Sequence, residues 1–140
     1  MKNLTLVLGC GRLGSAIANH ASQAGDNVVV VDPNQSSFEK LNDNFSGITI
    51  TSDCSDLDQL RDAGVERAHE VIITTGDDNT NLFLAQVCYK IFAVPYIYVR
   101  FDDPDLGLLT QGMPIKPIYP FQLSLDRFSV LRAGVEDKDR

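Results

Sequence analysis

The chain has 140 residues, of which 44% are hydrophobic and 22% are charged, and its formal net charge is −7. This length suits one domain with a single sizeable core, and the hydrophobic content excludes extensive disorder. The acidic balance argues against nucleic-acid binding, which needs a basic surface, and no apolar run reaches the roughly 20 residues that cross a bilayer.

Short apolar runs alternate with helical patterns along the chain. The β-branched run at 28–31 is typical of a buried parallel strand, and Leu13, Ile17 and Ala21 recur at the spacing of one helix face. In chain order the pattern predicts a strand over 3–8, a helix over 12–24, a strand over 28–31, a helix over 36–44, a strand over 48–51, a helix over 55–63, a strand over 71–75, a helix over 79–92, a strand over 96–100, a helix over 104–111, a strand over 115–119 and a helix over 121–132.

This alternation predicts an α/β fold built from βαβ units. Six strands in two such halves match a parallel Rossmann sheet in the order 3-2-1-4-5-6, with helices on both faces. We expect residues 1–120 to form this nucleotide-binding domain, residues 121–133 a C-terminal helix for subunit packing, and residues 134–140 a charged tail. A flavodoxin-like sheet is the alternative, which the loop after the first strand disfavours.

That loop carries a GxGxxG motif, Gly9-Cys10-Gly11-Arg12-Leu13-Gly14, directly between the first strand and the first helix. Gly9 permits the tight turn, Gly11 lets the backbone approach a pyrophosphate, and Gly14 lets the helix pack close to the strand. Free amides at the helix N-terminus then face the phosphates. The motif therefore predicts a nucleotide-binding loop, and a glycine turn without a ligand is the alternative.

Two charged residues extend this prediction. Asp32 ends the second strand, 18 residues after Gly14. A carboxylate there accepts hydrogen bonds from ribose hydroxyls and repels a 2′-phosphate, so we expect NAD(H) or an adenine nucleotide and not NADP. Arg12 follows Gly11 and adds a cation for the phosphates. The alternatives are a surface aspartate in a loop and a solvated arginine in the first helical turn.

Ligands of open α/β sheets bind where the carboxyl ends of the strands meet. Besides the glycine loop and Asp32, the residues expected there are Asp53, Cys54, Thr75, Gly76 and Arg100. Asp53 either faces an adenine amine or caps the following helix. Thr75 and Gly76 offer a small surface for the nucleotide. Arg100 needs an anionic partner, which is either a ligand phosphate or one of the aspartates at 77, 78, 102 and 103.

The cysteines Cys10, Cys54 and Cys88 are odd in number and lack CxxC spacing. This pattern predicts free thiols in a reducing compartment, so we expect a cytoplasmic protein without a zinc site. Cys10 is interpreted as a small residue that is tolerated beside the phosphates, because no resolving thiol is near it in the sequence.

The motifs, taken in order, resemble the TrkA-N or RCK (regulator of potassium conductance) family of nucleotide-binding domains. The resemblance covers residues 1–120, and its most specific part is an Ala-Gly-Val block followed by Asp-Asp-x-x-Asn-Leu. The segments that carry it are 9–14, 30–32, 52–55, 60–68, 71–82, Arg100 and 103–104.

The resemblance implies a regulatory, non-enzymatic domain that binds NAD(H) or ATP and ADP and assembles as a homodimer or a higher ring. It also implies an integral-membrane potassium channel or transporter as partner, gated by ligand-dependent conformational change, so that the chain lies peripherally at the inner face of the cell membrane without inserting. The last helix resembles the crossover helix that packs on the neighbouring subunit. From its residues alone, a helix that caps its own sheet edge is the alternative.

Two other functions remain open from the sequence. The first is a fragment of an NAD-dependent oxidoreductase, which would need a substrate-binding region beyond the Rossmann core. No His, Lys or Tyr suited to hydride chemistry is predicted at a strand end. The second is a nucleotide-sensing adaptor for another partner. The second ligand-binding module that often follows this domain in the family is absent, which predicts either a minimal one-domain subunit or part of a longer chain.

Overall fold

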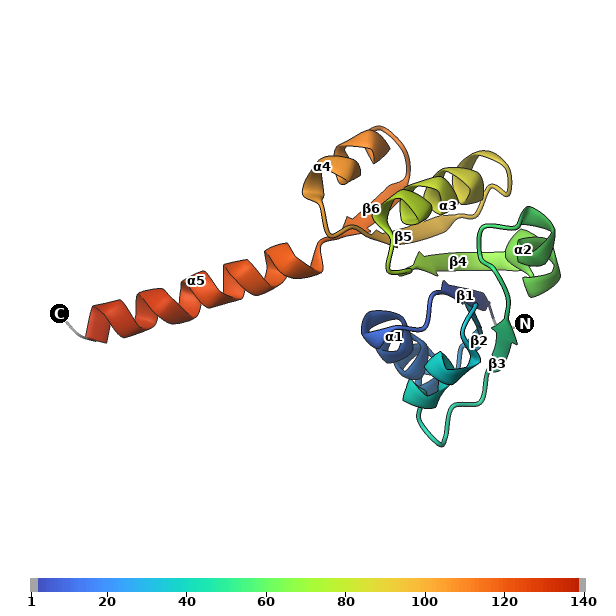
Figure 1. Ribbon diagram of the computed structural model, residues 1–140, viewed down its shortest axis with the longest axis horizontal. Coiled ribbons are helices and arrows are strands. Elements are labelled where there is room, and N and C mark those ends of the chain that lie inside the picture. The colour runs from blue at the N-terminus through green and yellow to red at the C-terminus, as the bar shows by residue number, and fades with distance from the viewer. Residues whose placement is uncertain (1–2, 139–140) are drawn as a thin grey trace.

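The computed structural model describes residues 3–138 and contains one six-stranded parallel sheet in the order β3-β2-β1-β4-β5-β6 (Figure 1). The predicted Rossmann topology is therefore confirmed. The strands are β1 (Leu4–Leu8), β2 (Asn27–Asp32), β3 (Ile48–Thr51), β4 (Ala68–Ile73), β5 (Tyr96–Arg100) and β6 (Ile115–Ile118). The helices are α1 (Arg12–Gln23), α2 (Leu57–Ala63), α3 (Asp78–Lys90), α4 (Pro104–Gly107) and α5 (Pro120–Lys138), with short 3-10 helices η1 (Gln35–Lys40), η2 (Val65–Arg67) and η3 (Leu108–Thr110).

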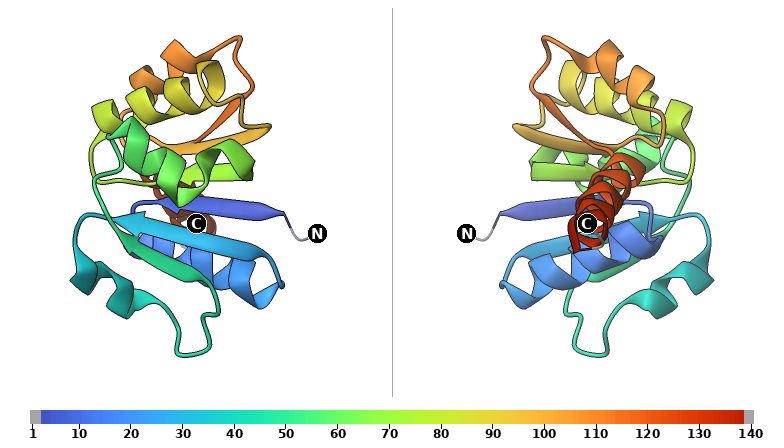
Figure 2. Two further views of the ribbon diagram at one scale, coloured as in Figure 1. Left: turned by 90° about the vertical axis from the view of Figure 1, so that its right-hand side faces the viewer. Right: turned by 90° about the vertical axis from the view of Figure 1, so that its left-hand side faces the viewer.

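Helices cover both faces of the sheet (Figure 2). On one face, α1 and η1 cover β1 and β2 through a buried cluster that includes Val7, Ala18 and Val30. On the other face, α2, α3 and α4 pack through a larger cluster that includes Val71 and Leu84. A strand buried on both faces needs apolar residues at nearly every position, which is why β2 carries the unbroken apolar run 28–31.

The register of the strands determines where the candidate site lies. Leu8, the last residue of β1, lies opposite Val31 of β2 and Ile73 of β4. The carboxyl ends of these three strands are therefore level, and the loops that follow them meet at one edge. This edge is the crevice where open α/β sheets bind ligands, on the side where the strand order reverses.

The helix predicted over 36–44 is a 3-10 helix that ends at Lys40. Its N-cap is Asn34, whose side chain accepts a hydrogen bond from the Ser36 backbone, and Leu41 adopts an extended conformation. The backbone N–H of Asn42 donates to Asn19 Oδ1 of α1 at 2.9 Å, outside any helical pattern. Asn19 Nδ2 also donates to the carbonyl oxygen of Lys40 at 3.4 Å. The side chain of Asn19 therefore takes backbone hydrogen bonds that a longer helix would need, and the helix ends after six residues.

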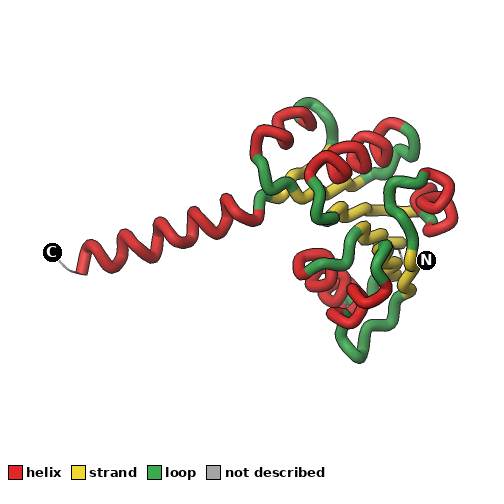
Figure 3. Tube along the Cα trace, viewed as in Figure 1, coloured by secondary structure: helices red, strands yellow, loops and turns green. Residues whose placement is uncertain are grey.

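The C-terminal helix α5 is longer than predicted and stands clear of the body (Figures 1 and 3). It begins at Pro120 and continues to Lys138, so the predicted charged tail is helical as far as the described residues extend, and residues 139 and 140 lie outside them. Arg132 donates to Glu136 at 3.1 Å, an i,i+4 pair that supports the helix beyond Gly134. Within residues 3–138, no helix is long and apolar enough to cross a membrane.

Candidate functional site

Two glycines of the loop after β1 are required by close packing. Gly9 has a φ of +98°, and a Cβ there would lie 2.8 Å from backbone atoms of Thr74 and Thr75. A Cβ on Gly14 would lie 2.0 Å from the carbonyl oxygen of Gly9 and 2.5 Å from Oγ1 of Thr74. A Cβ on Gly11 would meet nothing within 4 Å. The loop therefore has two glycines that allow close packing and one that faces open space.

Thr74, which the sequence analysis did not identify, holds this loop against β4. Its side chain is buried, and its hydroxyl donates to the carbonyl oxygen of Gly9 at 3.0 Å. Its backbone N–H donates to the carbonyl oxygen of Leu8 at 2.8 Å. Its place at the end of a predicted strand and within the segment 71–82 did not reveal this role, because its partners lie more than sixty residues away.

Asp32 braces the glycine loop from the end of β2. Oδ2 accepts a hydrogen bond from the backbone of Cys10, and Oδ1 accepts one from the backbone of Asn34, both at 2.8 Å. A carboxylate oxygen has two acceptor sites, so these contacts leave capacity for ribose hydroxyls. The carboxylate is half-buried and lines a cleft at this edge of the sheet.

The cleft has a volume of about 410 Å³ and opens at the carboxyl ends of the strands. Eight predicted site residues line it: Gly9, Gly11, Asp32, Asp53, Cys54, Thr75, Gly76 and Arg100. Five others that were not predicted complete it: Pro33, Ser37, Thr74, Asp77 and Thr80. A larger hollow of about 510 Å³ lies at the opposite edge, at the amino ends of β1, β2 and β3, away from the loops described here.

Four predicted residues lie outside the lining. Cys10 and Gly14 are buried behind the loop, and Leu13 is half-buried. Arg12 is the first residue of α1, and its side chain is exposed. The four ion pairs found within residues 3–138 do not involve it. Its guanidinium is therefore available to a ligand at the start of α1.

Asp53 does not cap α2, so one of its two predicted roles is excluded. The N-cap is Asp56, which accepts hydrogen bonds from the backbones of Asp58 and Gln59 at 2.9 and 3.3 Å. Asp53 Oδ1 accepts from the backbone and the hydroxyl of Ser55, and these bonds lower the pKa of the carboxyl. Asp53 is exposed at the rim of the cleft as a carboxylate.

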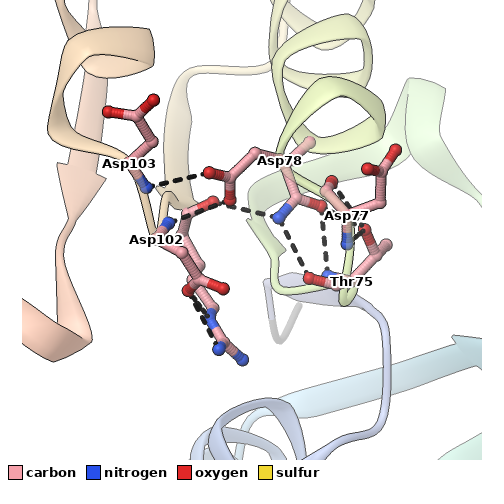
Figure 4. Close-up of polar contacts among 7 residues, drawn as sticks. Thr75, Asp77, Asp78, Asp102 and Asp103 are labelled. Carbon is pink, nitrogen blue, oxygen red and sulfur yellow. Dashed lines mark hydrogen bonds and ion pairs between the residues drawn. The ribbon is translucent and has the colours of Figure 1, made fainter.

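Arg100 has an anionic partner within the chain. Its Nε donates to Asp102 Oδ1 at 3.0 Å, and its Nη2 lies 3.0 Å from the same oxygen. Of the four candidate aspartates, Asp102 is the one that pairs. Asp78 accepts instead from the backbones of Asp102 and Asp103, both at 2.9 Å (Figure 4). At the N-cap of α3, Asp77 accepts from Thr80, whose hydroxyl lowers the pKa of this carboxyl.

Asn81 is a second structural residue of the site whose role was not predicted, although it lies within the segment 71–82. It is fully buried in α3, and its side-chain amide joins the ends of two strands. Nδ2 donates to the carbonyl oxygens of Thr75 and Arg100, both at 3.0 Å, while Oδ1 accepts from the backbone and the hydroxyl of Thr75. Asn81 therefore fixes the wall of the cleft opposite the glycine loop.

The thiols give a prediction about pH. Burial raises the pKa of Cys54 and of Cys88 from the usual 9.0 to about 12, and the charge of Asp32 adds to the effect on Cys54. Unfolded thiols release their protons at lower pH than these folded ones, so we expect the free energy of unfolding to fall as pH rises from about 9 towards 12. Urea titrations across this range measure the slope, and a flat profile contradicts the prediction.

The fold agrees with comparisons to known proteins. A model of the TrkA-N domain matches residues 5–116 of this chain. The chain belongs to the TrkA-N family. This TrkA-N chain is 32% identical over 133 residues to the Trk system potassium uptake protein TrkA of Streptomyces coelicolor, covering 94% of this chain and 60% of that protein. It is 26% identical over 100 residues to TrkA of Vibrio alginolyticus, covering 71% of this chain and 22% of that protein.

Solved structures extend the comparison. The GsuK channel bound to NAD matches 96% of this TrkA-N chain and 24% of its own chain, with 25% identity and a TM-score of 0.82. A structure of GsuK bound to ADP matches 92% of this chain and 33% of its own, with 26% identity and a TM-score of 0.76. This TrkA-N chain spans 60% or less of each of these four relatives.

Proposed function

We propose that this TrkA-N chain is a regulatory nucleotide-binding subunit or domain that controls a potassium channel or transporter. The observation that carries the proposal is the cleft itself. It combines an open Gly11, the N-terminus of α1 and the carboxylate of Asp32 at the carboxyl ends of level strands. Backbone amides at a helix N-terminus bind phosphates, and a carboxylate at the end of the second strand binds ribose.

NAD(H) and the adenine nucleotides ATP and ADP are the ligands that this chemistry favours. A relative of similar fold, GsuK, was solved with NAD and with ADP. The carboxylate of Asp32 repels a 2′-phosphate, so we propose that NADP is excluded. Arg12, exposed at the start of α1, supplies a cation for the phosphates.

We propose regulation and not catalysis as the role of the bound nucleotide. The thirteen residues that line the cleft, all within the described part of the chain, include no His, Lys or Tyr that could pass a proton to a hydride acceptor. The relatives named TrkA are potassium uptake proteins. A ligand that binds one arrangement of a two-state assembly more tightly shifts the population towards it. We therefore propose a cytoplasmic domain at the inner face of the membrane, bound to its transport partner.

We propose that a second copy of this chain packs on α5. Seven apolar side chains of α5 are each more than half exposed: Phe121, Leu123, Leu125, Phe128, Val130, Leu131 and Val135. An isolated apolar helix of this kind marks an interaction surface. A depression of about 290 Å³ beside α1, lined partly by Ile17, Ala21, Ile72 and Tyr98, offers an apolar surface for the partner's helix. The exposed α5 does not cap its own sheet edge.

Calorimetric titration of the Asp32→Ala variant tests nucleotide binding. We expect binding of NAD(H) and ADP to weaken about tenfold, because the variant loses charged hydrogen bonds to the ribose. The matched control is Asp43→Ala, an exposed aspartate outside the cleft, which we expect to bind as the wild type does. Unchanged affinity in Asp32→Ala contradicts the proposed ribose contact. Wild-type binding of NADP as tight as that of NAD contradicts the proposed exclusion.

A further inference from the structure

We infer that Asp102 determines ligand specificity by competing with a ligand phosphate for Arg100, an inference that rests on the proposed nucleotide binding. Arg100 ends β5 and supplies the one cation among the residues that line the cleft, all of which lie within residues 3–138. Two of its nitrogens, Nε and Nη2, lie 3.0 Å from Oδ1 of Asp102. The guanidinium therefore already has an anion beside it before a ligand enters.

The pair is fixed by the backbone on both sides. Asn81 donates to the carbonyl oxygen of Arg100 at 3.0 Å, and Asp78 accepts from the N–H of Asp102 at 2.9 Å (Figure 4). The side chains of Arg100 and Asp102 are 23% and 40% exposed. Surface ion pairs contribute little when two mobile side chains must be ordered, and here the backbone of both partners is already held. Asp102 is thus preorganised as a partner for Arg100.

Because the other charged residues of the cleft are acidic, the pair of Arg100 and Asp102 strongly affects the affinity for an anionic ligand. The other charged residues of the lining are Asp32, Asp53 and Asp77. With Arg100 neutralised by Asp102, the lining itself presents a phosphate with carboxylates and with no cation that is free of an anionic partner. Arg12, outside the lining at the start of α1, is then the remaining cation near the glycine loop. A phosphate that approaches Arg100 must displace Asp102 or share the guanidinium with it. The repulsion between Asp102 and the ligand grows with the charge of the phosphates. Asp102 therefore discriminates against ADP and ATP relative to adenosine, which carries no phosphate.

Titration of the isosteric Asp102→Asn variant tests this inference. We expect it to bind ADP, ATP and inorganic pyrophosphate about fivefold more tightly than the wild type, and adenosine with unchanged affinity. Asp105→Asn is the matched control, because it removes the same charge three residues away, in the exposed first turn of α4, where only the backbone N–H of Asp105 takes part in the cap. In the double variant Arg100→Gln, Asp102→Asn, the gain should disappear.

Each other result contradicts the inference. Equal or weaker binding of ADP by Asp102→Asn would show that the carboxylate does not compete, and an equal gain in Asp105→Asn would show a general charge effect. If the wild type binds nucleotides and Asp102→Asn shows no gain, only this inference fails. If neither protein binds any nucleotide or pyrophosphate, the proposed function fails as well. Asp102→Ala, which keeps the N–H that donates to Asp78, repeats the test should the asparagine variant not fold.

Discussion

Gly14→Ala is expected to destabilise the protein by about 3 kcal/mol and to abolish nucleotide binding. The added Cβ would lie 2.0 Å from the carbonyl oxygen of Gly9, which belongs to the backbone and has no rotamer to change. The helix α1 would have to move away from β1, and the bond from Thr74 to Gly9 would be strained. Urea unfolding measures the loss of stability, and calorimetry measures the loss of binding.

Gly11→Ala separates the two effects. Gly11 has a φ of −80°, and its added Cβ meets no atom within 4 Å. The free energy of unfolding should therefore stay within about 0.5 kcal/mol of the wild-type value. Nucleotide affinity should still fall, since the methyl group occupies the space through which a pyrophosphate approaches the backbone. A Gly14→Ala protein as stable as the Gly11→Ala protein contradicts the packing role of Gly14.

The Phe128→Glu, Leu131→Glu double variant is expected to convert a dimer into a monomer. Both side chains are more than half exposed on α5, at 55% and 54%, and contribute little to the folding of a single chain. Two buried carboxylates at an apolar interface are costly to desolvate, so association should fail. Light scattering should give the mass of one chain, 15.4 kDa, for the variant and twice that mass for the wild type.

Ser124→Glu, Ser129→Glu is the control for this experiment. It adds two charges to the same exposed helix without removing an apolar side chain. We expect this protein to retain the wild-type mass if the apolar side chains drive association. A wild-type protein that has the mass of one chain at high concentration contradicts the proposed dimer. Monomers formed by both double variants would show that added charge alone prevents association.

The sheet order and most of the cleft could be predicted because their signals are local. The glycine loop follows its strand directly, and Asp32 ends the next strand, so the topology alone brings them together. Thr74 and Asn81 could not be predicted in their roles, because their partners lie at the ends of other strands. The choice between a ligand and Asp102 as partner for Arg100 likewise depended on side-chain geometry.

The errors in the predicted helices have equally specific causes. Helical spacing over 36–44 did not reveal that the side chain of Asn19, in another helix, would bind the backbone of Lys40 and Asn42, which a longer helix needs for its own hydrogen bonds. The end of α5 was placed too early because only one large apolar residue, Val135, follows Arg132, whereas the i,i+4 pair of Arg132 and Glu136 supports the helix there. Such hydrogen bonds and ion pairs decide where an element ends, and hydrophobic periodicity carries no information about them.

The first turn of α3 is attached to the loops on both of its sides, and this has a mechanical consequence. Asp78 binds the backbone after β5, and Asn81 binds both Thr75 and Arg100. The loop after β5 is therefore coupled to α3, because a displacement of the loop also displaces the N-terminal end of this 13-residue helix. Phe83 lies on α3 with 44% of its surface exposed, so it moves together with this helix. A displacement of the backbone beside Arg100 is thus transmitted through α3 to the outer surface of the domain.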